Sequence, residues 1–127
     1  TSVRRDPRIA HSLGEAAFNL GKNDVAIGRF RDYINLLPEG AQIGSAYYFL
    51  GEVYLRQDRL QHADIALRTA LQFDPRNARW WTRLGYVRER AEDWVHSLQA
   101  YQAALAINPG LTDAVRGKER VEARARQ

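Results

Sequence analysis

The 127-residue chain contains neither cysteine nor methionine, and its only lysines are Lys22 and Lys118. Without cysteine it has no disulfide bonds, no thiol nucleophile and no thiolate metal ligand, although this absence fits reducing and oxidising compartments equally well. No apolar run approaches the roughly 20 residues that a membrane-spanning helix needs. The sequence therefore predicts a soluble protein without a membrane span, and it leaves the compartment open between cytoplasm and periplasm.

The chain begins at Thr1 without an initiator methionine, and no charged-then-apolar leader precedes the first predicted helix. We therefore expect a processed chain or a segment of a longer protein.

The composition is that of one folded domain. Hydrophobic residues make up 45% of the chain and charged residues 27%, which excludes a disordered tail. The formal net charge of +4 comes almost entirely from arginine. For a chain of this size, such a mild excess favours an ordinary solvated surface over nucleic-acid binding.

Three sets of marker residues recur along the chain in one register. The steps between members are 37 and then 34 residues in every set: Gly14, Gly51 and Gly85; Ala26, Ala63 and Ser97; Pro38, Pro75 and Pro109. Three sets in one register indicate an internal repeat, which is typical of stacked repeat proteins.

Each repeat unit has the pattern of two amphipathic helices. In the middle unit the first helix places apolar or small residues at i, i+3, i+4 and i+7, namely Tyr47, Leu50, Gly51 and Tyr54. A second stripe contains Ala63, Leu67, Ala70 and Leu71. Asp74-Pro75 ends it, because the residue before a proline is disfavoured in helical geometry. At the front of the chain, Asp6-Pro7 predicts an N-cap followed by proline at the first helical position.

The small residues predict where the two helices of a unit approach each other. We expect Gly51 to face Ala63 and Gly85 to face Ser97. Large residues then fill the space between successive units: Tyr47, Tyr54, Trp81 and Tyr101. The longer first step puts three extra residues around 40–43, which either lengthen the connection or start the next helix early.

With these marks the chain resembles the tetratricopeptide repeat (TPR) family, whose pattern is Trp-x2-Leu-Gly-x2-Tyr followed by Ala, Phe, Ala and Pro marks. The middle and third units carry the pattern best, whereas Ala10 and Tyr33 depart from it in the first unit. The resemblance implies a single all-α domain over 1–127, a right-handed superhelix of three helix-turn-helix repeats. The repeats are expected at about 7–40, 44–77 and 78–111, with a C-terminal capping helix at about 112–126 that is apolar on one side only.

The resemblance also implies a protein-binding scaffold or adaptor, whose first helices line a concave groove. Carried onto this sequence, the groove positions are His11, Glu15, Asn19, Tyr48, Phe49, Glu52, Arg56, Arg79, Arg83, Tyr86, Arg90, Arg116 and Arg120. Arginine suits carboxylates because its planar fork donates two parallel hydrogen bonds. One hypothesis is an extended peptide with an acidic end and an apolar anchor near Tyr48, Phe49 and Tyr86. The alternative is that the arginines are solvated helix residues paired to nearby Glu or Asp.

Some family members clamp the carboxylate tail of heat-shock chaperones with five polar groove residues. The matching positions here are His11, Glu15, Phe49, Arg79 and Arg83. Glu15 repels a carboxylate and Phe49 donates no hydrogen bond, so such a clamp is not expected.

The sequence supports neither an enzyme nor a cofactor. His11, His62 and His96 are far apart in the chain, and no paired His-Glu spacing indicates a metal site. The marker glycines lie inside predicted helices and form no phosphate-binding loop, and no local turn motif supports a Ser-His-Asp triad.

Two other functions stay open. An incomplete first repeat could stack on a second copy and make a self-assembling homo-oligomer. Trp80 and Trp94 beside arginines could stack on bases, although such residues serve a protein partner equally well. We favour a protein or peptide partner over nucleic acid. Repeat arrays of this kind are common in bacterial secretion, envelope and polysaccharide pathways, so a bacterial source is expected by association.

Overall fold

The computed structural model describes residues 6–127, and within them the chain forms seven α-helices and no strand. The helices are α1 (Pro7–Asn19), α2 (Asn23–Leu36), α3 (Ile43–Arg56), α4 (Leu60–Phe73), α5 (Ala78–Arg90), α6 (Trp94–Ile107) and α7 (Thr112–Ala125). This confirms the predicted all-α class, with three helix-turn-helix units and one further helix. None of these seven helices has both the length and the apolar character that crossing a bilayer requires.

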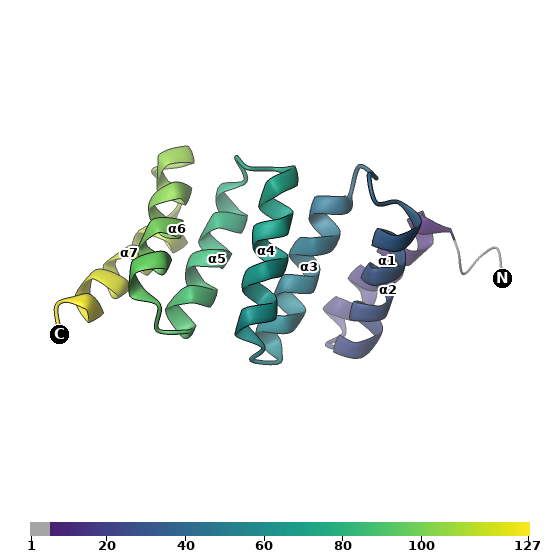
Figure 1. Ribbon diagram of the computed structural model, residues 1–127, viewed down its shortest axis with the longest axis horizontal. Helices are drawn as coiled ribbons and strands as arrows, with labels where there is room; N and C mark the ends of the chain where they lie inside the picture. Colours follow the sequence, from purple (N-terminus) through teal and green to yellow (C-terminus); the bar gives the residue numbers. More distant parts are fainter. Residues whose placement is uncertain (1–5) are drawn as a thin grey trace.

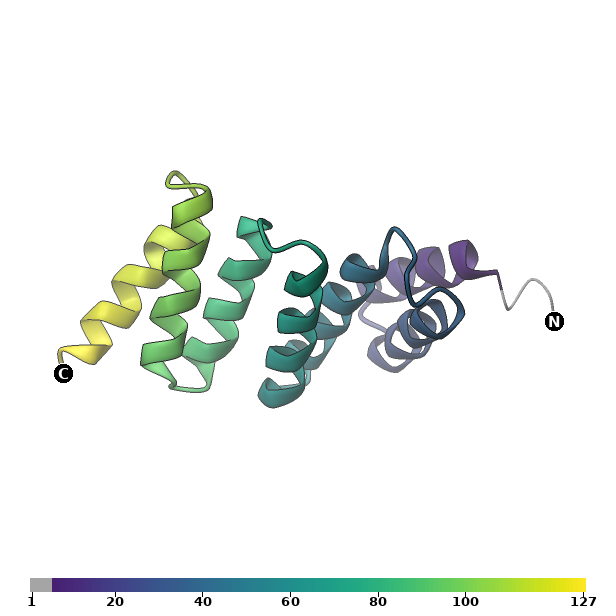
Figure 2. The same cartoon turned by 45° about the horizontal axis from the view of Figure 1, so that its top comes forward.

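The helices pack as antiparallel pairs, α1 with α2, α3 with α4 and α5 with α6, in a row along the long axis (Figure 1). Each pair contacts mainly its neighbour, and α7 packs on α6 and α5. The first helix, α1, and the last, α7, lie at opposite ends of the row (Figure 2). The core is therefore built between successive pairs, as expected for a helical repeat protein.

The predicted first helix start is confirmed. The Asp6 side chain accepts a hydrogen bond from the backbone nitrogen of Arg8 at 2.9 Å, and Pro7 occupies the first turn. Asn77 and Asp93 cap α5 and α6 in the same way, by accepting from Trp80 and His96 nitrogens. These caps satisfy backbone donors that a helix start leaves without intrahelical partners.

The turn inside each helix pair uses a left-handed residue at the same repeat position. Gly21, Asp58 and Glu92 have φ angles of 74°, 58° and 60°, and they follow one another at the repeat steps of 37 and 34 residues. Only the first of the three is glycine, the residue that adopts this conformation without a steric cost.

The repeated glycines are packing residues, as predicted. A Cβ atom on Gly14, Gly51 or Gly85 would lie 2.8 Å from a ring or side-chain carbon of the paired helix. The residues met are Phe30, Leu67 and Tyr101, each four positions after the small residue of its unit. The expected approach of Ser97 to Gly85 is confirmed as well, because the Ser97 hydroxyl donates to the Gly85 carbonyl at 2.7 Å.

The extra residues of the first repeat lengthen the connection between α2 and α3, and α3 also begins earlier in the repeat. Residues 37–42 join α2 to α3, whereas only residues 74–77 join α4 to α5. In the repeat register, α3 also begins one residue earlier than α5. Buried Tyr33 anchors the longer connection, since its hydroxyl accepts from the backbone nitrogen of Gln42 at 3.0 Å.

The last helix closes the C-terminal end of the core. Ala114, Gly117 and Val121 of α7 are buried, and Gly117 lies directly against the ring of buried Tyr101. Glu119, on the other side of α7, is exposed. This one-sided burial is the arrangement predicted for a capping helix.

Candidate functional site

The odd-numbered helices form one face of the row and are tied together by direct contacts. The links run from α1 to α3 (His11 Nε2 to Ser45 Oγ, 3.3 Å; Arg56 Nη1 to the Phe18 carbonyl, 2.7 Å), from α3 to α5 (Arg83 Nε to Glu52 Oε2, 2.8 Å) and from α5 to α7 (Arg120 Nε to Glu89 Oε2, 2.8 Å). On the other side, a pocket separates α2 from α4. We call the surface of α1, α3, α5 and α7 the groove face, and the surface of α2, α4 and α6 the outer face.

His11 does not line the groove face as predicted, because it is buried with only 2% of its surface exposed. Its ring makes edge contacts with Phe30, Tyr33 and Phe49 at centroid distances of 5.4, 5.2 and 6.1 Å. Nδ1 lies 2.8 Å from a Glu15 carboxylate oxygen. Burial lowers the pKa of His11, and the Glu15 charge opposes that shift only in part. His11 is thus a structural residue between α1, α2 and α3.

Phe49 also belongs mainly to the core. It stacks on Phe30 at 5.1 Å and meets Phe18 edge-on at 5.1 Å. Of the predicted N-terminal groove residues, Asn19 is exposed, and Glu15 is half exposed beside His11. Of the predicted groove residues on α1, Glu15 and Asn19 are therefore the accessible ones, and they offer a carboxylate and an amide.

The middle of the groove face contains a stacked pair of rings, Tyr48 and Trp80, which we call the aromatic step. Tyr48 of α3 stacks on Trp80 of α5, with ring centroids 5.5 Å apart and planes at 11°. Burial raises the pKa of the Tyr48 hydroxyl, and the charge of Glu52 adds to the rise, whereas Arg83, Arg79 and Arg56 act to lower it. Trp80 was not among the predicted groove residues, although its place beside Arg79 in the first turn of α5 was a signal for it.

Three of the six predicted groove arginines already have carboxylate partners. Arg83 holds the Glu52 carboxylate through two hydrogen bonds of 2.8 and 2.9 Å. Arg120 holds Glu89 in the same way, at 2.8 and 3.0 Å. Arg90 pairs with Asp58 at 2.8 Å. For these three arginines the structure agrees with the alternative expectation, pairing to nearby Glu or Asp, because carboxylates of the preceding repeat lie within reach of their guanidinium groups.

Three other groove arginines have no carboxylate partner among residues 6–127: Arg56, Arg79 and Arg116. The Arg56 guanidinium lies 3.7 Å above the Phe18 ring centroid and bonds the Phe18 carbonyl, so its position is defined by α1. Arg79 and Arg116 are exposed. They are therefore the cations of the groove face that are best placed to meet an external anion.

A cavity of about 290 Å³ lies at the C-terminal end of the groove face. Its walls come from α5, α6 and α7 and include Thr82, Arg83, Tyr86, Tyr101, Asp113, Arg116 and Arg120. Three guanidinium groups and a single carboxylate, that of Asp113, thus border one hollow. Asp113 was not predicted as a groove residue.

Two of these guanidinium groups, those of Arg83 and Arg120, are paired with Glu52 and Glu89, and Arg120 acts on the pKa of Glu89. Burial acts to raise the pKa of Glu89, but hydrogen bonds from Arg120 and the Tyr101 hydroxyl outweigh it, and the pKa is lowered. The Arg83 guanidinium lies 5.1 Å from the Tyr86 ring centroid, a cation–π contact that presents a flat surface. The cavity thus combines planar cations with aromatic rings, which suits carboxylates beside apolar groups.

Within residues 6–127, no three His, Asp or Glu side chains gather as a metal site requires. His96 bonds the Asp93 carboxylate at the start of α6, with Nδ1–Oδ2 at 2.8 Å. His62 lies on the outer face beside the Tyr54 ring, at a centroid distance of 5.3 Å.

Comparison with known proteins matches the chain to models described as tetratricopeptide repeat, over residues 44–77 and 62–112. Together these matches cover 44–112, more than half of the chain. Among curated proteins, the general transcriptional corepressor ssn6 of Schizosaccharomyces pombe is 27% identical over 114 residues, 86% of this chain and 10% of that protein. The cell division cycle protein 27 homolog of Caenorhabditis elegans is 39% identical over 64 residues, 50% of this chain and 8% of that protein.

The chain therefore spans about a tenth of the length of these curated relatives. Both relatives are eukaryotic, so they give no support to the expected bacterial source.

Two solved structures share the fold. The TPR domain of Arabidopsis OM64 superposes with a TM-score of 0.86 at 18% identity, covering 95% of this chain and 98% of that one. The first TPR of Spaghetti (RPAP3), bound to the HSP90 peptide SRMEEVD, gives 0.88 at 16% identity, covering 95% and 94%.

Proposed function

The chain belongs to the tetratricopeptide repeat family, and from that premise we propose that it is a protein–protein interaction module, part of a larger scaffold or adaptor. Its groove face binds an extended segment of a partner, with an acidic residue of that segment held at Arg79 or Arg116. Tetratricopeptide repeats typically serve as binding modules rather than enzymes, and the proposal contains no catalytic step.

The observation that carries the proposal is the unequal pairing of the groove arginines. Arg83, Arg90 and Arg120 are held by carboxylates of their own chain, whereas Arg79 and Arg116 are exposed and have no acid partner in the described part of the chain. A partner carboxylate at either site gains a charge-assisted hydrogen bond without displacing an internal one. This narrows the acidic-ligand hypothesis to two arginines.

The aromatic step supports an apolar anchor beside the acid site. Tyr48 and Trp80 stack across α3 and α5, and Arg79 immediately precedes Trp80 in the chain. Aromatic residues and arginine are enriched at the centres of protein interfaces. We therefore place an apolar partner side chain at the Tyr48–Trp80 step and its acidic neighbour at Arg79.

A protein of the same fold gives independent support, since the Spaghetti domain was solved with an acidic HSP90 peptide. The carboxylate clamp of chaperone tails is not proposed here. His11 is buried and Phe49 is apolar, so two of its five positions offer no accessible donor.

The test is a pull-down from the source lysate with two matched variants. Arg79→Glu/Arg116→Glu reverses the two acid-free groove arginines. Arg76→Glu/Arg126→Glu makes the same charge change at exposed sites in the α4–α5 turn and at the C-cap of α7. We expect partners recovered by the wild type and the control to be lost with the groove variant. Equal recovery by all three proteins overturns the proposed groove.

A second candidate is self-assembly, favoured by exposed apolar residues on the first helix pair. Leu13, Leu20 and Val25 are 43%, 70% and 49% exposed, and a second copy stacked on this pair would cover them. Light scattering over a concentration series tests this. Association that disappears in Leu13→Lys/Leu20→Lys supports self-assembly, and a concentration-independent monomer excludes it.

A further inference from the structure

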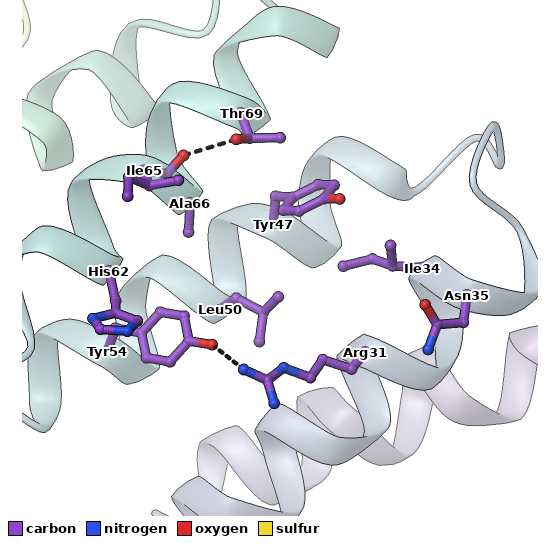
Figure 3. A pocket seen from close by; sticks show the side chains of 10 residues that line it. All are labelled: Arg31, Ile34, Asn35, Tyr47, Leu50, Tyr54, His62, Ile65, Ala66 and Thr69. Atoms are coloured by element: carbon purple, nitrogen blue, oxygen red, sulfur yellow. Dashed lines mark hydrogen bonds between the residues drawn. The ribbon is translucent and has the colours of Figure 1, made fainter.

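The outer face has a notch between α2 and α4, over α3, that the groove hypothesis does not use (Figure 3). The cavity measures about 390 Å³, within the range of small-ligand pockets. Its lining includes Arg31 of α2, Leu50 and Tyr54 of α3, and Ile65, Ala66 and Thr69 of α4.

The notch has an apolar floor and one cationic rim. Leu50, Tyr54 and Ala66 are buried beneath it, and Ile65 on the α4 rim is 57% exposed. The Thr69 hydroxyl donates to the Ile65 carbonyl at 2.8 Å and is therefore occupied. On the α2 rim, Arg31 reaches across to the Tyr54 hydroxyl, with Nη2–Oη at 2.9 Å (Figure 3).

The equivalent junction of the next repeat shows what the notch lacks. There, Asp64 of α4 accepts from Arg68 Nε at 2.7 Å and from Arg88 Nε at 2.9 Å, so the two arginines share one carboxylate of the chain. In the repeat register Arg68 corresponds to Arg31, and Asp64 corresponds to Ile27, by the step of 37.

The first junction therefore keeps the arginine and lacks the acid. Tyr54 stands where the next repeat has Arg88, by the step of 34, and its hydroxyl is neutral. Within residues 6–127, no carboxylate lies at ion-pair distance from Arg31. One bond to Tyr54 leaves other guanidinium donors of this exposed residue available.

We propose that the notch between α2 and α4 binds a second protein segment, one in which an acidic side chain lies next to an apolar one. The apolar side chain occupies the floor formed by Leu50, Tyr54 and Ala66, and the carboxylate pairs with Arg31 in the role that Asp64 has in the next repeat. Charge complementarity selects this occupant, because the rim presents an unneutralised cation over an apolar floor. The site lies on the outer face, so it is independent of the groove proposal.

The test is a selection of displayed random peptides on the groove variant Arg79→Glu/Arg116→Glu, so that acidic peptides are repelled from the groove. Enriched peptides are synthesised, and their Kd is measured with Arg31→Gln and with Ile65→Asp, which places an acid on the exposed rim. Arg68→Gln is the matched control, since it removes the equivalent arginine of the next repeat. Thermal unfolding of each variant verifies that it is folded.

We expect the enriched peptides to carry Asp or Glu beside an apolar residue. Loss of a charge-assisted hydrogen bond should weaken their binding about tenfold in Arg31→Gln, and Ile65→Asp should weaken it as well, while Arg68→Gln leaves it unchanged.

The inference is overturned by enriched peptides without acidic residues, by equal effects of Arg31→Gln and Arg68→Gln, or by no enrichment on the groove variant. The last outcome leaves the groove proposal standing. Self-association of the wild type that Arg31→Gln abolishes also overturns it, because the occupant is then a second copy of the chain.

Discussion

Arg83 of α5 and Glu52 of α3 form a two-bond ion pair across the junction of the second and third helix pairs, with distances of 2.8 and 2.9 Å. Arg120 and Glu89 repeat this arrangement one junction later, again 31 residues apart. Arg83 and Arg120, which were predicted to bind a ligand, therefore join successive repeats within the chain.

The ion pair gives a prediction for stability. Arg83→Ala leaves the nearly buried Glu52 carboxylate without its partner, and we expect a loss of about 2 kcal/mol in the free energy of unfolding. Arg79→Ala, at an exposed arginine without an acid partner, should change it by less than about 0.5 kcal/mol. Urea unfolding followed by circular dichroism measures both. Equal effects would show that the pair contributes nothing to the junction.

The packing glycines give a second prediction. Gly85→Ala places a Cβ atom 2.8 Å from the Tyr101 ring, and we expect a loss of about 1–3 kcal/mol in the free energy of unfolding. Gly28→Ala is the control. It lies inside α2 with open space around it, so alanine should stabilise the protein by about 0.5–1 kcal/mol through helix propensity. We expect the melting temperature to fall in Gly85→Ala and to rise in Gly28→Ala. A decrease in both variants would contradict the packing role of Gly85.

The left-handed turns give a third prediction. Glu92 has a φ of 60° with a Cβ atom present, so Glu92→Gly removes a steric cost of about 1 kcal/mol and should raise the melting temperature. The greater freedom of glycine in the unfolded chain offsets part of this gain. Gly21→Ala places a Cβ atom in the same conformation and should lower the melting temperature. A decrease in both variants would indicate that the Glu92 side chain has a stabilising role of its own.

Buried His11 gives a prediction for pH. Its pKa is lowered from 6.5 by burial, so the unfolded chain takes up a proton on this residue more readily than the folded chain does. The stability contribution is fully present above pH 6.5 and is lost as the pH falls through the folded-state pKa. We therefore expect the melting temperature to decrease below pH 6.5, and to decrease less steeply in His11→Gln.

The groups that face His11 are the Glu15 carboxylate on its own helix, the Tyr33 ring of α2 and the Ser45 hydroxyl of α3. If the melting temperatures of wild type and His11→Gln fall equally as the pH is lowered, other groups cause the acid sensitivity.

The helices and their pairing were predictable, because the marker glycines and prolines recur in one register and helical periodicity lies between them. The left-handed turns were harder to predict. Gly21 alone carries the usual signal, whereas Asp58 and Glu92 occupy the same conformation without it. For Asp58 and Glu92, the position in the repeat was the only sequence signal of a left-handed conformation.

Side-chain partners across repeats were not predictable to the same degree. The pairs of Arg83 with Glu52 and of Arg120 with Glu89 depend on the offset between neighbouring helices, which spacing along one helix does not define. His11 was assigned to the groove by position. Tyr33, which replaces a small residue, helps to enclose it instead.

The Tyr48–Trp80 stack also determines what intrinsic fluorescence reports. The three tryptophans, Trp80, Trp81 and Trp94, all lie in α5 and α6, so excitation at the indole band samples the α3–α5 junction and the C-terminal half. Helices α1 and α2 contain no tryptophan. Unfolding of this first pair alone would lower the far-ultraviolet dichroism while the tryptophan emission stays constant. Comparing the two signals during one denaturation therefore distinguishes a molecule that unfolds as one unit from one that opens first at its amino-terminal pair.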